Sequence, residues 1–157
     1  IQNPIPMKKI FIALLVVLVV LQFFQIDKTN PAVDESKDFL KTQNTPEEIA
    51  SIIKTSCYDC HSNESKYPWY SNVQPAGWFL KDHIDEGRRE LNFSTFTDYE
   101  VKRQDHKLEE CIEYIEKDEM PLGSYTLIHR EAALTEAQKN ILIDYFKSVR
   151  TKLNYKE

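Results

Sequence analysis

The sequence predicts an all-α fold of about four helices, preceded by an N-terminal membrane helix. Helix-start signals recur along the chain, and a long apolar run lies near its N-terminus. No stretch alternates polar and apolar residues for long enough to form a strand. A chain of 157 residues is expected to hold one domain and an appendage.

The apolar run IFIALLVVLVVLQFF follows Met7 and two lysines, a pattern typical of a secretory signal or a membrane anchor. As a helix, Ile10 to Ile26 would rise about 25 Å, slightly short of the ~30 Å hydrocarbon core, so Gln22 and Gln25 are expected at an interface. The residues that follow offer no small-residue cleavage site. We therefore expect an uncleaved signal-anchor over residues 7–26, with a cleaved signal peptide as the alternative. The lysines predict that the rest of the chain crosses the membrane.

The remaining boundaries follow from composition. Residues 1–6 are interpreted as an upstream extension. Residues 27–44 are polar, charged and without clear periodicity, so we expect a linker there. The domain itself is predicted over residues 45–157.

Four helices are predicted within the domain. They run from Thr45 into Cys57, from Pro75 to near Asn92, from Thr97 to about Lys117, and from Thr135 onward. Three of them begin with a capping box, TPEE, TDYE or TEAQ, in which the first and fourth residues bond to each other's backbone amides. Two loops between the helices are expected to be ordered, because both are rich in residues that pack against a flat apolar surface.

The pentapeptide CYDCH, Cys57 to His61, is the motif that carries chemistry. Its spacing is that of a c-type haem attachment site. Each thiol can add to one haem vinyl group, and the next residue, His61, then supplies an axial nitrogen to the iron. We expect one covalent haem c held by Cys57, Cys60 and His61.

Other interpretations of the motif stay open. A zinc site needs two further ligands, and the chain has no second cysteine pair. A thioredoxin-like dithiol belongs in a βαβ context, which the sequence lacks. A structural disulfide or a coincidence is the third alternative.

Cys111 stands alone and is expected to be a small buried hydrophobe, with an exposed thiol or an intermolecular bridge as the alternative.

Met120 is the candidate for the sixth iron ligand. Pro121 follows it and stiffens the loop that would present the sulfur, and a thioether ligand raises the reduction potential. A methionine that fills a gap in the core is the alternative. His83 is the rival distal ligand, although an isolated helical histidine is more often a hydrogen-bonded packing residue.

Haem propionates call for hydrogen-bond donors. The candidates are Trp78 and Arg88 from the helix after the motif and Tyr67 and Trp69 from the loop before it. Arg88 is preferred because its fork matches a carboxylate. Solvated charge or ordinary packing is the alternative for each.

The order of an N-terminal helix, C-x-x-C-H, a Met-Pro loop and a C-terminal helix with an aromatic pair resembles small c-type cytochromes. The segments CYDCHSNESKYPWY, PAGW, HIDEGRRELNFSTF and MPLGSYTLIHREAALTEAQKNILIDYF resemble the bacterial haem-binding domain family of membrane-anchored c-type cytochromes, from about Thr45 to Val149. Phe96 and Tyr145 stand where that family tends to have tryptophan, so we expect changes of packing only. The resemblance implies a cytochrome c-like bundle around a covalent haem.

Together these observations predict a monohaem electron carrier that exchanges single electrons with redox partner proteins. It would be single-pass in the bacterial inner membrane, with the haem domain in the periplasm. It is not expected to be an enzyme or to need a small-molecule substrate, and a net charge of −5 argues against nucleic acid. The alternatives are a peroxidase-like haem enzyme and a haem-based sensor or accessory subunit of a redox complex.

Overall fold

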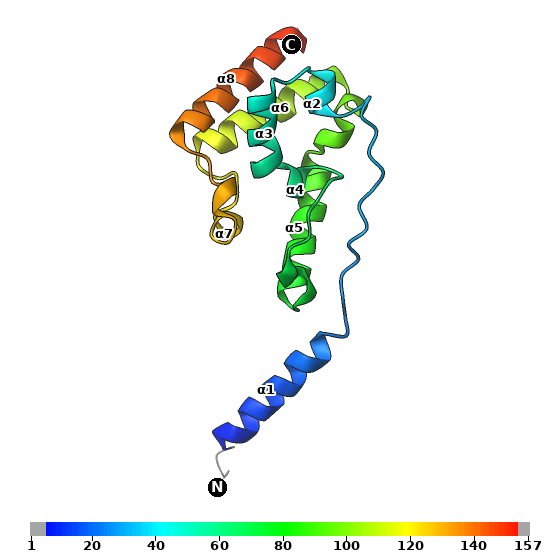
Figure 1. Ribbon diagram of the computed structural model, residues 1–157, viewed down its shortest axis with the longest axis vertical. Helices are drawn as coiled ribbons and strands as arrows, with labels where there is room; N and C mark the ends of the chain where they lie inside the picture. Colours follow the sequence, from blue (N-terminus) through cyan, green and yellow to red (C-terminus); the bar gives the residue numbers. More distant parts are fainter. Residues whose placement is uncertain (1–5, 154–157) are drawn as a thin grey trace.

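The computed structural model describes residues 6–153, and every regular element in that range is helical (Figure 1). The longer helices are α1 (Met7–Leu21), α3 (Glu47–Ser56), α5 (Ala76–Glu90), α6 (Val101–Glu116) and α8 (Glu136–Leu153). The shorter elements are α2 (Phe39–Thr42), α4 (Tyr58–His61), η1 (Trp69–Asn72), η2 (Phe93–Asp98), α7 (Gly123–Thr126) and η3 (Arg130–Ala132). The prediction of an all-α domain with four main helices is confirmed. Residues 1–5 of the predicted upstream extension and the last four residues of the predicted domain lie outside the described range.

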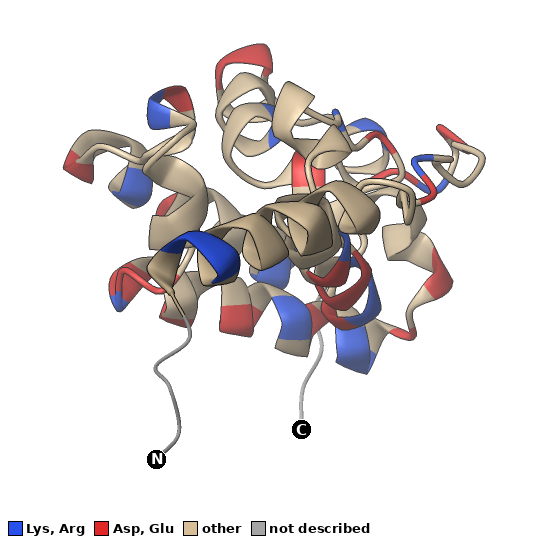
Figure 2. Cartoon of the chain, turned by 90° about the horizontal axis from the view of Figure 1, so that it is seen from below, with Lys and Arg blue, Asp and Glu red and all other residues tan. Residues whose placement is uncertain are grey.

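The helices of the domain gather at the end of the molecule farthest from α1. There α6 packs along α8, and α3 packs against α4 and α8. α5 packs against α4 and extends from this cluster toward α1 (Figure 1). Basic and acidic residues are interspersed over the domain, whereas α1 carries charged residues only at its N-terminal turn (Figure 2).

The core is organised around Phe39, which is fully buried. Its ring lies 4.8 Å from the Phe96 ring and 5.2 Å from the Phe93 ring, and the rings of Tyr145 and Phe146 lie at 6.2 and 6.0 Å. Such tilted and edge-on pairs are favourable arrangements of aromatic side chains. Phe96 and Tyr145, the two aromatic replacements noted in the sequence, are thus both packed on the same ring.

Phe39 comes from the segment that the sequence placed in the linker, residues 27–44. The structure forms α2 there, with Asp38 as its N-cap: the carboxylate accepts from the amides of Leu40 and Lys41 at 2.9 and 3.2 Å. It also accepts from the Tyr58 hydroxyl at 2.8 Å. A single helical turn with two adjacent apolar residues shows no helical periodicity, so α2 could not be predicted from the sequence.

Of the three predicted capping boxes, only TEAQ forms. The Thr135 amide donates to Gln138 Oε1 at 2.9 Å, and the Gln138 amide donates to Thr135 Oγ1 at 3.3 Å. The prediction of the other two boxes is wrong, because tertiary contacts compete for their residues. Thr45 pairs its hydroxyl with that of Tyr145 at 2.6 Å, and α3 begins after Pro46. Thr97 belongs to η2, and α6 begins only at Val101.

The helix predicted over residues 7–26 ends at Leu21. At this end of α1 the Gln22 side chain pairs with the backbone of Gln74. None of the side chains of α1 is buried. Within residues 6–153, no helix has both the length and the apolar character needed to cross a bilayer.

The unequal capping boxes yield a test. We expect Thr135→Ala to lower the free energy of unfolding by about 1 kcal/mol, because the amide of Gln138 loses its side-chain acceptor. Urea denaturation measures the change. Thr97→Ala is the matched control, since the exposed Thr97 side chain caps no helix, and its variant should unfold at the parent urea concentration. Equal losses of unfolding free energy in the two variants would contradict the assignment of Thr135 as the helix cap.

Candidate functional site

The C-x-x-C-H motif forms one tight turn at the junction of α3 and α4. Cys57 ends α3, and its carbonyl accepts from the amides of Cys60 and His61 at 3.2 and 2.9 Å. All three cysteines of the chain are free thiols. Because this turn is local, its two thiols and the imidazole are carried on a single rigid unit.

The environment of His61 defines its tautomer. Its Nδ1 lies 3.0 Å from the carbonyl oxygen of Gly87 and 3.0 Å from that of Leu91. Carbonyl oxygens only accept, so Nδ1 carries the hydrogen and Nε2 presents a lone pair. Within residues 6–153, Nε2 makes no hydrogen bond. Burial lowers the pKa of His61 and outweighs the hydrogen bonds to Leu91 and Gly87, which act in the opposite direction, so the neutral ring is favoured. A neutral imidazole oriented through Nδ1 is the form that binds a metal.

Gly87 allows the approach of α5 to this turn. A Cβ atom at this position would lie 2.7 Å from the Cys60 carbonyl oxygen and 3.2 Å from the Cys60 Cβ. No larger residue fits without displacing backbone. The glycine therefore lets the last turns of α5 lie directly on α4, where their carbonyls meet the imidazole.

The two motif thiols stay protonated at neutral pH. Burial raises the pKa of Cys57 to about 12 and that of Cys60 to about 11, with a smaller contribution from the neighbouring Cys60 and Asp59, respectively. Burial also raises the pKa of Cys111. Zinc binding requires thiolates and further ligands. In the described part of the chain, no three metal-binding side chains come together.

Large apolar side chains are exposed on the elements that flank the motif. Leu127 is 75% exposed at the end of α7, and Ile128 and Phe79 are exposed as well. α7 and α5 lie on either side of the motif's end of α3 (Figure 1). The motif turn itself carries an imidazole lone pair and two thiols, which can hold a metal-containing group, and the flanking helices expose apolar side chains.

A comparison with protein-family models decides which group this is. The model described as the haem-binding domain matches residues 16–148. The chain belongs to the haem-binding domain family. No curated protein and no solved structure matches it. The resemblance inferred from the motifs is confirmed, and membership supports haem as the cofactor.

The predicted propionate donors of this haem-binding domain differ in whether they are already hydrogen-bonded within the protein. Arg88 is largely engaged in holding the loop after the motif: Nε donates to the Ser62 carbonyl at 2.7 Å, and Nη2 donates to Asn30 and Ser65 at 2.7 and 2.8 Å. The hydroxyl of Tyr67 is buried and has no hydrogen-bond partner within residues 6–153. A buried hydroxyl of this kind calls for an acceptor, such as a haem carboxylate.

The two tryptophans lie at the end of α5 nearest α1. The indole N–H of Trp78 donates to the carbonyl of Phe24 at 2.9 Å. Trp69, in η1, is 76% exposed. The donor of Trp78 is therefore already used by the segment that follows α1.

The two candidate distal ligands occupy different environments. Met120 is half-buried in the loop after α6, and its amide donates to the Tyr114 carbonyl at 3.2 Å. His83 Nδ1 donates to the Phe79 carbonyl of the same helix at 2.8 Å, and the two rings lie 4.2 Å apart. His83 therefore makes a hydrogen-bonded packing contact within its own helix, which was the alternative expected for an isolated helical histidine.

A polar link that the sequence did not reveal ties the loop after Met120 to the motif. The Tyr125 hydroxyl donates to Asp59 Oδ2 at 2.6 Å, and the Tyr70 hydroxyl lies 2.8 Å from His129 Nε2. The Tyr125 and His129 rings stack at 4.4 Å. These contacts join residues about sixty positions apart, and only the aromatic content of the two loops hinted at them.

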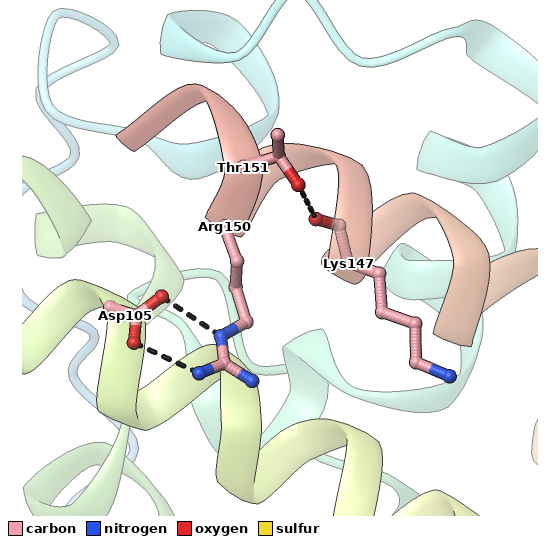
Figure 3. A pocket seen from close by; sticks show the side chains of 4 residues that line it. All are labelled: Asp105, Lys147, Arg150 and Thr151. Carbon is pink, nitrogen blue, oxygen red and sulfur yellow. Dashed lines mark hydrogen bonds and ion pairs between the residues drawn. The ribbon is translucent and has the colours of Figure 1, made fainter. Parts of the chain in front are cut away.

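A shallow hollow between α6 and α8 is a separate feature. It is lined by Asp105, Lys147, Arg150 and Thr151 (Figure 3). Arg150 holds Asp105 in a two-pronged pair, with Nε–Oδ1 and Nη2–Oδ2 distances of 2.8 and 2.9 Å. This arrangement joins the two helices.

Gly87 provides a test of the site. We expect Gly87→Ala to cost about 1–3 kcal/mol of stability, because the methyl group meets backbone of Cys60. The displaced α5 also moves both carbonyls away from His61 Nδ1, so the haem content of the purified protein should fall. Absorbance of the haem per chain and urea denaturation measure the two effects. Gly123→Ala is the matched control, because a Cβ there has open space. A parent-like Gly87→Ala protein would contradict the close packing.

Proposed function

We propose that this haem-binding domain is a c-type cytochrome that transfers single electrons between redox partner proteins. One haem c would be attached through Cys57 and Cys60, with His61 as the axial ligand. The observation that carries the proposal is the orientation of His61, whose Nδ1 hydrogen is given to two backbone carbonyls. That arrangement reserves the Nε2 lone pair for a metal, one residue after two thiols at the spacing of a haem attachment motif.

The chain's own residues then have distinct tasks. Bound haem supplies a one-electron iron couple. The carbonyls of Gly87 and Leu91 fix the ring plane and tautomer of His61. The Tyr67 hydroxyl is the free donor for a propionate, and Leu127 and Phe79 are exposed apolar side chains of the flanking elements. None of these tasks requires a substrate or an acid–base step, which favours electron transfer over catalysis.

Met120 is proposed as the sixth ligand. The Met120 loop continues into α7, and the Tyr125–Asp59 and Tyr70–His129 bonds tie α7 and the turn after it to α4 and η1. This attachment supports a fixed position for the loop. Thioether ligation stabilises ferrous iron and suits an electron carrier.

We further propose that α1 anchors the protein in the bacterial inner membrane, with the domain in the periplasm. In support of this, the side chains of α1 from Ile10 to Val20 are apolar and exposed, and its lysines lie at the N-terminal turn only. Exposed apolar surface of this extent calls for an apolar environment. The basic N-terminal turn favours the cytoplasmic side for that end.

Covalent attachment is tested by removing the thiols. The purified parent protein, made in a host with haem c maturation, should carry a mass increase of one haem per chain that survives acidic acetone. The double variant Cys57→Ala, Cys60→Ala should lose this increase completely, because no thioether can form. Cys111→Ala is the matched control and should keep its haem. Haem that extracts from the parent protein would overturn the proposed cytochrome.

Electron transfer and its ligand are tested together. Voltammetry of the parent protein should show one reversible one-electron wave and no catalytic current with peroxide; a catalytic current would favour a peroxidase. Met120→Ala should abolish the near-infrared methionine-to-ferric-iron band and lower the potential, because the iron loses a thioether. His83→Ala, the control, should leave both unchanged. A parent protein without the band, whose potential shifts in His83→Ala and not in Met120→Ala, would assign the ligand to the histidine.

A further inference from the structure

The end of α1 is joined directly to the domain. The side-chain amide of Gln22 pairs with the backbone of Gln74 in both directions: Nε2 donates to the Gln74 carbonyl at 3.0 Å, and Oε1 accepts from the Gln74 amide at 2.8 Å. The two residues are 52 positions apart in the sequence. Such a two-way amide pair fixes orientation as well as distance.

Neighbouring contacts reinforce this joint. The Trp78 indole donates to the Phe24 carbonyl at 2.9 Å, and Gln25 Nε2 donates to the Asn72 carbonyl at 3.3 Å. Lys28 bonds to the side chain of Asn72. A flexible tether between an anchor and a domain makes no such contacts. We call the contacts between residues 22–28 and residues 72–78 the anchor joint.

The part of the domain that receives α1 is itself rigid. It consists of η1 and the first turn of α5, residues 69–78, and we call it the tip. At Gly77 a Cβ would lie 2.5 Å from the Ser71 carbonyl oxygen, so η1 lies directly on the first turn of α5. A shift of α1 relative to the tip therefore has to break hydrogen bonds, because the tip does not yield.

Aromatic and apolar side chains surround the anchor joint without being covered. Phe23 is 81% exposed and Trp69 is 76% exposed, and Phe24 and Val73 are exposed beside them. Tryptophan with its apolar body and polar N–H is the residue typical of the boundary between lipid headgroups and acyl chains. The tip and the last turn of α1 lie at the same level of the molecule, and α1 continues away from the domain (Figure 1).

We propose that the tip docks into the interfacial layer of the lipid bilayer, and that the anchor joint holds the domain there in one orientation. The proposal rests on the membrane anchor proposed above. The lipid interface is the occupant that the structure favours, because the exposed aromatic surface is continuous with the apolar surface of α1. The domain thus lies on the membrane surface in a fixed orientation and does not move freely on a flexible linker.

Brominated lipids test the docking, because bromine near the headgroup quenches tryptophan within contact distance. Full-length holoprotein is placed in phosphatidylcholine–phosphatidylglycerol vesicles with or without bromine at the upper acyl carbons. The ratio of the two emissions cancels quenching by the haem. Trp69 and Trp78 are the only tryptophans, so the difference between the parent protein and Trp69→Phe reports on Trp69. We expect bromine to lower the Trp69 emission.

The anchor joint is tested in the same vesicles. Gln22→Ala combined with Gln25→Ala removes the three joint bonds made by the glutamine side chains and should reduce the quenching of Trp69, while co-flotation with the vesicles is unchanged. Gln43→Ala, remote from the joint, is the matched control and should leave the quenching at the parent value. Quenching that persists in the double variant would overturn the orienting role of the joint.

The outcomes separate the two proposals. Failure of the parent protein to co-float with vesicles would refute the anchor. Co-flotation without quenching of Trp69 would overturn the docking and leave the anchor standing. If the shielding of Trp69 from acrylamide in detergent rises with protein concentration, a second copy of the chain covers the tip in place of lipid.

Discussion

The hydrogen bonds from His61 Nδ1 to the carbonyls of Gly87 and Leu91 are the constraint on which the site depends. They require the end of α5 to lie on α4, and that approach requires a glycine at position 87, where a Cβ would meet the Cys60 carbonyl oxygen at 2.7 Å. The same contact brings Arg88 to the loop after the motif. The C-terminal end of α5 therefore orients the His61 imidazole and allows only glycine opposite Cys60. It also holds the loop that follows the motif.

The rest of the domain holds this junction from the other side. α3 leads into Cys57, and Thr45, just before α3, is bonded to Tyr145 of α8. Tyr58, the first residue of α4, stacks on Phe93 and donates to Asp38. The aromatic core and the cap of α2 thus fix both ends of the α3–α4 unit. A small domain with few glycines obtains its rigidity here from packed rings and short polar links.

Local features could be read from the sequence. The C-x-x-C-H turn and the TEAQ box involve residues three or four positions apart, so their geometry follows from a single turn of helix. The acceptors of His61 could not be predicted, because they are backbone carbonyls, which every residue carries. The predicted Thr45 capping box does not form, because the Thr45 hydroxyl is hydrogen-bonded to Tyr145, a hundred positions away. The Tyr125–Asp59 bond likewise depends on tertiary packing.

The position of Phe39 sets a limit on how the chain can be shortened. Upstream of it, Asn30 accepts from Arg88, and the Ala32 carbonyl accepts from Asn63. A fragment that starts at Asp27 keeps all of these interactions and loses only those made by α1 and residues 22–25. A fragment that starts at Thr45 lacks the central ring of the core. Cleavage that leaves the haem-binding domain intact is thus confined to a short window directly after α1.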